Sequence, residues 1–155
     1  MKRKLPYSER RDADKIRANW TKTGTLLRKE EYSVAIIRAA TTVELAVNLV
    51  VRQELIAKRA LPENFVAKLM KWANGMSGKL DKILKPLWEE TPNGKKTFKQ
   101  VYGPISRVNS KRNSVVHTGE FKSRTTAIEV LNDAHGVILA LVTAYEPKFV
   151  LKTIT

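Results

Sequence analysis

The chain has 155 residues, of which 43% are hydrophobic, so one packed domain is expected and wholesale disorder is not. No apolar run reaches the roughly 18 residues of a membrane span, the N-terminus lacks the apolar stretch of a secretory signal, and the absence of cysteine excludes disulfides and thiolate zinc sites. The net charge of +14 favours a polyanionic partner, nucleic acid before an anionic membrane, over a basic protein with no such role.

The N-terminal segment carries half of that charge, because its first 29 residues hold ten basic and three acidic side chains. Residues 1–7 are predicted to be a flexible basic arm. A helix is expected from Ser8, whose hydroxyl can cap it, since Asp12 and Asp14 then lie in the first turns, where negative charge suits the helix dipole. Gly24 interrupts the thin apolar stripe of this helix and predicts a bend or a break.

A central helix is predicted over residues 30–58, because most of its circumference is apolar and the segment contains no glycine or proline. At about 100° per residue its polar side chains fall within an arc of roughly 120°; they are Arg38, Thr41, Glu44, Asn48 and Arg52. This stripe is either a solvated face or the border of a functional groove. Glu44 has apolar neighbours on both sides, and a carboxylate buried there would need a cationic partner.

Shorter helices are predicted to follow. Pro62 suits the first turn of one helix, and Asn74-Gly75 ends it. Ser77 is expected to cap a second short segment, which Pro86 stops or kinks. The cluster of turn residues at 91–94 predicts a turn before the next helix.

Two further helices complete the predicted bundle. Gly103-Pro104 is expected to divide a lead-in from a main helix over residues 104–117, which Gly119 ends. Ser123 is expected to cap the last helix, over residues 124–146.

The expected fold class is therefore all-α, a single-domain antiparallel bundle of about five helices over residues 8–146. The tail 147–155 alternates weakly between apolar and polar residues, so it is expected to be extended. No internal repeat or second domain is predicted.

The stretch Lys111–Gly119 contains an arginine, an amide and a histidine within six residues, in a chain with only two histidines. On a helix Asn113 and His117 share a face, and Arg112 lies about 100° to one side. Arginine binds phosphate oxygens, histidine exchanges a proton near neutral pH, and asparagine orients a hydroxyl or phosphate without adding charge. The alternative is structural: His117 stabilised by the helix dipole and Arg112 a surface charge.

These side chains suit cleavage of RNA by its own 2′-hydroxyl. A base removes the hydroxyl proton, the arginine stabilises charge on the phosphate oxygens, and a second group must protonate the leaving oxygen. One chain offers only His117 here, so a symmetric homodimer would supply both base and acid. No metal or other cofactor is expected, because His135 is isolated between Ala134 and Gly136 and cysteine is absent.

Three cations close to this stretch are candidate RNA-binding residues: Arg107, Lys111 and Lys122. A solvated charge is an equally good interpretation of Lys111. Phe121 and the tryptophans could stack on unpaired bases, but aromatic side chains at helical spacing are more often core residues.

Residues 112–119 resemble the signature of the HEPN superfamily, an arginine and a histidine separated by four to six residues, often with a polar residue directly after the arginine. Residues 30–55 are similar to the long early helix of that family, and the resemblance covers about residues 25–146. It implies a helical bundle, usually dimeric, and in many members a metal-independent endoribonuclease of toxin–antitoxin, phage-defence or RNA-processing systems.

By that resemblance Arg112 and His117 become the catalytic pair and Asn113 the supporting polar residue. We add Glu44 as a partner that orients Arg112. One departure is Gly119, since some family toxins carry there a tyrosine that a partner antitoxin modifies.

The expected function is a cytoplasmic endoribonuclease that acts as a homodimer, with an antitoxin or defence-system protein as a further partner and no membrane association. Some family members are non-catalytic. The alternative is therefore a basic helical module that binds nucleic acid or a partner protein without cleaving it.

Overall fold

The structure, a computed structural model, describes residues 4–154. Residues 1–3 of the expected basic arm lie outside this range. The described chain forms a 3₁₀ turn η1 (Tyr7–Glu9), the α-helices α1 (Asp12–Arg28), α2 (Tyr32–Arg52), α3 (Glu63–Ala73), α4 (Gly75–Lys79), α5 (Lys85–Trp88), α6 (Pro92–Thr118) and α7 (Arg124–Thr143), and the π-helical turns η2 (Gln53–Ala57) and η3 (Leu80–Leu84). The all-α prediction is confirmed. Because η2 continues α2, and α4, η3 and α5 are contiguous, residues 4–154 build six helices instead of five.

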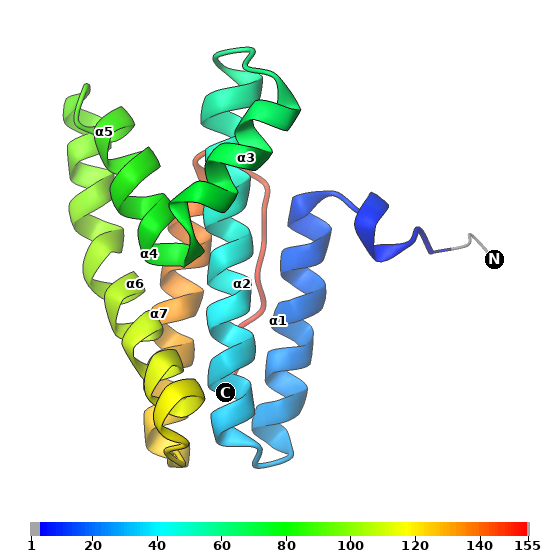
Figure 1. Cartoon of the computed structure of the whole chain (residues 1–155). Helices are drawn as coiled ribbons and strands as arrows, with labels where there is room; N and C mark the ends of the chain where they lie inside the picture. The colour runs from blue at the N-terminus through cyan, green and yellow to red at the C-terminus, as the bar shows by residue number, and fades with distance from the viewer. Residues whose placement is uncertain (1–3, 155) are drawn as a thin grey trace.

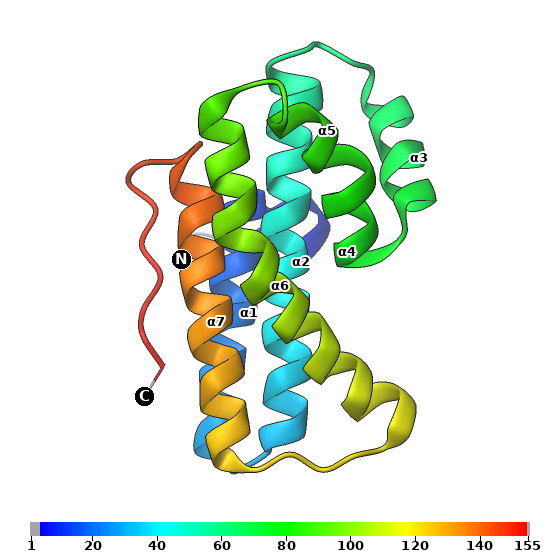
Figure 2. The same ribbon diagram turned by 90° about the vertical axis from the view of Figure 1, so that its left-hand side faces the viewer.

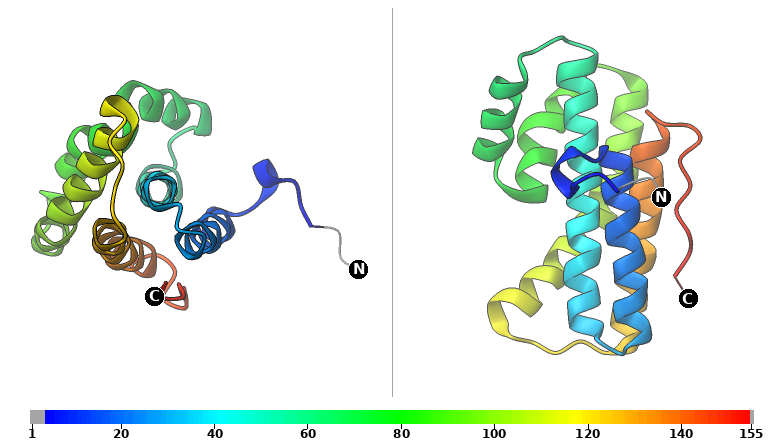
Figure 3. Two further views of the ribbon diagram at one scale, coloured as in Figure 1. Left: turned by 90° about the horizontal axis from the view of Figure 1, so that it is seen from below. Right: turned by 90° about the vertical axis from the view of Figure 1, so that its right-hand side faces the viewer.

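Helix α2 is the centre of the bundle (Figures 1 and 3). It packs against α1, α7, α6 and α4. Eleven of its residues are buried, because apolar side chains surround most of the helix. The prediction of a central helix is confirmed.

The long helices run up and down, with α1 antiparallel to α2 and α6 antiparallel to α7 (Figure 1). The shorter helices α3, α4 and α5 lie over the end of α2 that is farthest from the α1–α2 turn. The C-terminal end of α6, which carries Arg112 and His117, therefore lies at the other end of the bundle, with the α1–α2 turn and the start of α7.

Two apolar segments of this bundle, Tyr32–Ala57 and Arg124–Thr143, also have the length and hydropathy of a membrane-spanning helix. They are α2 with η2, and α7, which bury extensive faces against the other helices. Packing inside the bundle accounts for their apolar composition.

Helix α1 differs from its prediction at both features marked in the sequence. It begins at Asp12, and Ser8 lies in the preceding 3₁₀ turn, where it caps no α-helix. It also continues through Gly24 without a break. Gly24 is buried, and a Cβ atom there would lie 3.3 Å from the side chain of Ile154. The glycine thus permits close approach of the C-terminal tail.

Helix α6 is longer than predicted. It is a single helix of 27 residues that begins at Pro92 and continues through Gly103-Pro104, so the expected division is wrong. The hydroxyl of Thr91 caps it by accepting a hydrogen bond from the Gly94 amide at 3.0 Å. Pro104 removes the bond to the carbonyl of Gln100, an exposed residue where water can replace it. Gly119 ends α6 with a left-handed φ of 67°, as predicted.

Other helix ends agree in part. Asn74 and Gly75, both with positive φ, end α3 as predicted. Ser77 lies inside α4 and caps nothing, and the helix continues past Pro86 to Trp88 after the π-turn η3. Ser123 caps α7 by accepting a bond from the Thr126 amide at 3.2 Å, although α7 ends at Thr143, three residues early.

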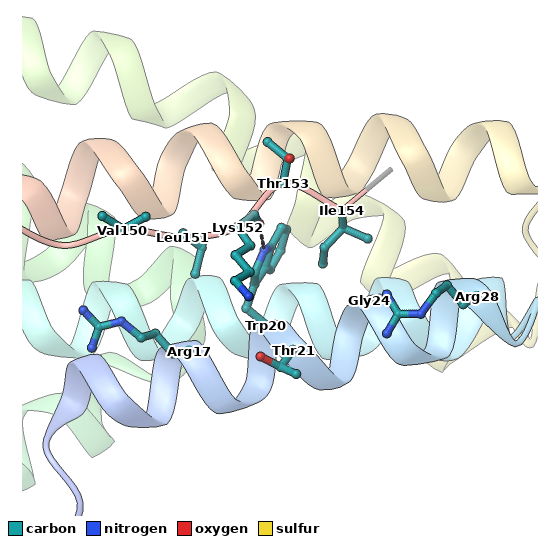
Figure 4. A pocket seen from close by; sticks show the side chains of 10 residues that line it. All are labelled: Arg17, Trp20, Thr21, Gly24, Arg28, Val150, Leu151, Lys152, Thr153 and Ile154. Carbon is teal, nitrogen blue, oxygen red and sulfur yellow. Dashed lines mark hydrogen bonds between the residues drawn. The ribbon is translucent and has the colours of Figure 1, made fainter.

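The C-terminal tail follows α1 and α7 without forming a strand in its described part (Figures 1 and 4). The indole of Trp20 donates a hydrogen bond to the Lys152 carbonyl at 2.6 Å. The Nε2 atom of His135 lies 3.0 Å from the Leu151 carbonyl oxygen, and its ring packs against Trp20. Phe149 and Leu151 are buried. The tail is therefore part of the core, and His135 holds it there.

Candidate active site

The end of α6 that carries the Arg112–His117 motif leaves the bundle. Val108 is the last buried residue of α6; residues 112–115 are half-buried and residues 116–118 are exposed. Figure 2 shows this end of α6 (yellow) diverging from α7. The motif therefore lies at the surface, where a large substrate has access to it.

A polar pocket of about 460 Å³ opens beside the motif. It lies between three elements: the middle of α2, the junction of α3 with α4, and the C-terminal half of α6. Most of its lining residues carry amide, hydroxyl or charged side chains. The full lining is Ala40, Thr41, Glu44, Asn74, Gly75, Met76, Ser77, Asn109, Arg112 and Asn113. The volume is within the range of about 300–1,000 Å³ that is typical of ligand pockets.

Arg112 and Asn113 point their polar groups toward each other in this pocket. The Arg112 guanidinium donates from Nη1 to Asn113 Oδ1 at 3.0 Å. No other hydrogen bond of the guanidinium is recorded within residues 4–154, so four of its five donors remain for a ligand. The arrangement suits recognition of phosphate oxygens by an arginine that an amide orients.

Glu44 lies in the same pocket, but its ion-pair partner is Lys79 and not Arg112. Lys79 Nζ donates to Glu44 Oε1 at 2.9 Å. The Lys79 side chain is only 8% exposed, whereas that of Glu44 is 40% exposed. The expectation of a cationic partner for Glu44 is met by a residue that the motif did not indicate, and its expected role in orienting Arg112 has no support in this geometry.

The amides of the pocket are also arranged by neighbouring side chains. Asn109 Nδ2 donates to the Ser77 hydroxyl at 3.0 Å, which joins α6 to α4 across the pocket. One turn beyond Glu44 on α2, Asn48 has a buried Oδ1 atom with no hydrogen-bond partner within residues 4–154.

The two histidines differ sharply in their surroundings. His117 is exposed at the last turn of α6, has no recorded hydrogen bond within residues 4–154, and does not line the pocket. His135 is bonded to the tail, and its ring packs against that of Trp20 at a tilt of 37°. The chain thus brings Arg112, Asn113 and Glu44 together in one pocket, and leaves His117 one turn away on the same helix.

The three candidate RNA-binding cations have different positions. Arg107 faces α7, where it forms two hydrogen bonds with Asp133 at 2.8 and 2.9 Å that raise the pKa of the arginine. The Lys122 side chain is almost covered and pairs with Glu120 at 2.7 Å, which lowers the pKa of that carboxyl. Only Lys111 is exposed with no recorded side-chain bond within residues 4–154.

Apolar side chains are exposed around the motif. Phe121 is 94% exposed, and Val116 and Val34 are about half exposed. The loop that carries Phe121 is fixed to the start of α2, because the Lys122 amide donates to the Ser33 hydroxyl at 2.9 Å. The predicted core role of the tryptophans holds for Trp20 and Trp88, whereas Trp72 is 61% exposed.

Sequence reasoning missed Lys79, Ser77 and Asn109. A signal was present for Lys79, because it lies three residues after Met76 and four before Ile83, on the stripe that α4 and η3 bury. Asn109 similarly lies four residues after the buried Ile105. A polar residue in an apolar stripe is a candidate for a buried polar interaction.

A second pocket, of about 520 Å³, lies between α1 and the tail, and the side chains of Arg17, Arg28 and Lys152 border it (Figure 4).

Within the described chain no group of three or more metal-ligating side chains is found. Comparison with protein-family models, curated proteins and solved structures finds no match to this chain.

Proposed function

We propose that the chain is a metal-independent endoribonuclease of the HEPN type, in which the motifs of two protomers form one site. The observation that carries the proposal is the contrast between its histidines. His135 is half-buried and bonded to the tail, which is the environment of a structural residue. His117 is exposed on the helix that also presents Arg112 and Asn113.

The proposed reaction needs two proton transfers. His117 of one protomer takes the proton from the RNA 2′-hydroxyl, whose oxygen forms a bond to the adjacent phosphorus. The bond from phosphorus to the 5′-oxygen breaks, and the second protomer's copy of the same histidine protonates that oxygen. Arg112 stabilises the charge that develops on the non-bridging oxygens. The products are a 2′,3′-cyclic phosphate and a 5′-hydroxyl.

Exposed apolar side chains near the motif support the proposed dimer. Val34, Val116 and Phe121 are exposed apolar side chains near the motif, and apolar aromatic residues are favoured at the centres of protein interfaces. A symmetric contact there would bring both motifs to one seam and would cover the side chains that one protomer exposes.

The enzymatic proposal is tested by incubating total RNA with the wild type in the presence of EDTA at neutral pH. Cleavage with cyclic-phosphate ends is expected, and His117→Ala and Arg112→Ala should each reduce it at least a hundredfold. Arg107→Ala is the matched control. It removes an arginine of the same helix, but the guanidinium of Arg107 is already bonded to Asp133. Undiminished cleavage by a folded His117→Ala protein would overturn the assignment.

The dimer is tested separately by sedimentation. Phe121→Asp should shift the protein to monomers and reduce cleavage with it, because a charge cannot be buried in the apolar contact without a partner. Phe65→Asp is the control, since Phe65 is an exposed aromatic residue on α3. A wild type that cleaves RNA as a monomer would exclude the shared site.

A non-catalytic basic module remains the second candidate function. It is favoured by exposed cations of α1 and the following turn, Lys22, Arg28 and Lys29. Its expected signature is binding of RNA, or of an acidic antitoxin or defence-system protein, that weakens steeply with salt and is indifferent to His117.

A further inference from the structure

The ion pair between Lys79 and Glu44, of which only Glu44 lines the pocket beside Arg112, is asymmetric. Lys79 is buried and Glu44 is not. Burial of an ammonium group is costly unless it is paired, so this arrangement stabilises a carboxylate that faces the pocket and fixes its position.

The carboxylate keeps acceptor capacity toward the pocket. Oε1 accepts from Lys79, and no bond of Oε2 is recorded within residues 4–154. Each carboxylate oxygen can accept two hydrogen bonds. Glu44 would repel a phosphate in direct contact with it, so the part of an RNA ligand that contacts Glu44 must present hydrogen-bond donors.

We infer that this pocket binds the nucleobase next to the scissile phosphate, and that Glu44 selects guanine. The inference rests on the proposed RNA substrate. Guanine presents adjacent N1–H and N2–H donors, which match the two oxygens of a carboxylate. Uracil has a single N–H donor between two carbonyls, and adenine and cytosine place an acceptor nitrogen beside the amino group. Single-stranded RNA exposes these edges for recognition.

The position of the pocket agrees with this role. Arg112 and Glu44 line the same cavity, so a phosphate at the arginine brings the attached base to the carboxylate. Asn74, Asn109 and Asn113 supply amide donors for the remaining guanine acceptors, O6 and N7. Lys79 is a positioning residue, because it holds Glu44 and does not line the cavity.

The test is binding of fluorescent single-stranded hexauridylate, and of the same RNA with one central guanosine or inosine, followed by anisotropy. The His117→Ala background prevents cleavage during the measurement. The guanosine oligonucleotide should bind about tenfold more tightly than hexauridylate, since a bidentate contact discriminates by that order. Inosine lacks the N2 amino group and should lose most of the difference.

Glu44→Gln, added to that background, should bring the three affinities within twofold of one another, whereas Glu63→Gln, the same charge change on α3, should preserve the preference. A guanosine preference that survives Glu44→Gln, or equal binding of guanosine and inosine, would overturn the inference without any dependence on folding of the variant. If the wild type cleaves RNA but shows no base preference, the role of Glu44 is refuted and the nuclease proposal stands. If the protein prefers guanosine but the wild type never cleaves RNA, the nuclease proposal is refuted and the role of Glu44 stands.

Discussion

Glu54 offers a test of the packing at the end of the bundle where η2 continues α2. It lies in η2 and is 6% exposed. Three side chains donate to its carboxylate: Lys58 at 2.9 Å, Arg59 at 2.8 Å and the Tyr145 hydroxyl at 2.5 Å. The Tyr145 bond joins η2 at the end of α2 to the segment that follows α7, whereas Lys58 and Arg59 follow Glu54 closely in the chain. Glu54→Gln keeps the shape of the side chain and removes its charge.

The magnitude follows from the exposure of the donors. A hydrogen bond to a charged group contributes roughly 1.5–3 kcal/mol. The side chains of Lys58 and Arg59 are 58% and 37% exposed, so water replaces part of what they lose. Tyr145 still has an amide oxygen to donate to. We expect Glu54→Gln to lower the free energy of unfolding by about 2 kcal/mol, which at a slope of about 2 kcal/mol/M moves the urea midpoint down by about 1 M.

The same loss should depend on pH. Burial alone would raise the pKa of Glu54, but the hydrogen bonds from Lys58, Tyr145 and Arg59 outweigh it and lower the pKa below its ordinary value of 4.5. The pKa of Tyr145 is raised by burial and by Glu54, so the phenol keeps its proton. A depressed carboxyl pKa stabilises the fold above the unfolded-state pKa, and this contribution disappears as pH falls through the folded-state pKa.

Urea unfolding followed by circular dichroism at pH 7 and at several points below pH 4.5 measures both effects. The difference between wild type and Glu54→Gln should be largest at pH 7 and shrink on acidification, while Glu63→Gln stays close to wild type throughout. A Glu54→Gln protein within 0.5 kcal/mol of wild type at pH 7 would refute the reasoning, as would a difference that persists in acid.

Three further predictions concern the fold and the motif helix. Gly119→Ala should lower the free energy of unfolding by about 1 kcal/mol, because φ is 67° there. No atom lies within 4 Å of the added Cβ, so the cost comes from backbone strain alone, and Gly119→Asn should cost less in the same urea titration. Trp20→Phe removes the donor to the Lys152 carbonyl and should accelerate amide exchange in the tail while that of α2 is unchanged. Arg107→Ala breaks an exposed pair with Asp133 and should leave the melting temperature nearly unchanged.

Local signals in the sequence predicted the bundle well where one segment decides its own structure. The apolar circumference of α2, the Ser123 cap and the positive-φ residues Asn74 and Gly75 are all such cases. The predicted interruptions at Gly24 and Pro104 were wrong for the same reason. A single unfavourable residue costs a few kcal/mol at most, and packing along the rest of a long helix outweighs it.

The sequence predicted only the part of the candidate site that lies on α6. Arg112, Asn113 and His117 follow from spacing within α6. Contacts between elements did not, since the partner of Glu44 comes from α4, 35 residues away. That pairing depends on how α3 and α4 fold over α2, which no periodicity in either segment encodes.

The tail bond has a consequence for the kinetics of folding. Trp20 and Lys152 are separated by 132 residues, and contacts between distant residues form slowly, because the entropy of closing the loop is lost before the contact stabilises the chain. The helices, which depend on local contacts, are therefore expected to form before the tail docks on α1. Until that last step the indole of Trp20 lacks its hydrogen-bond acceptor.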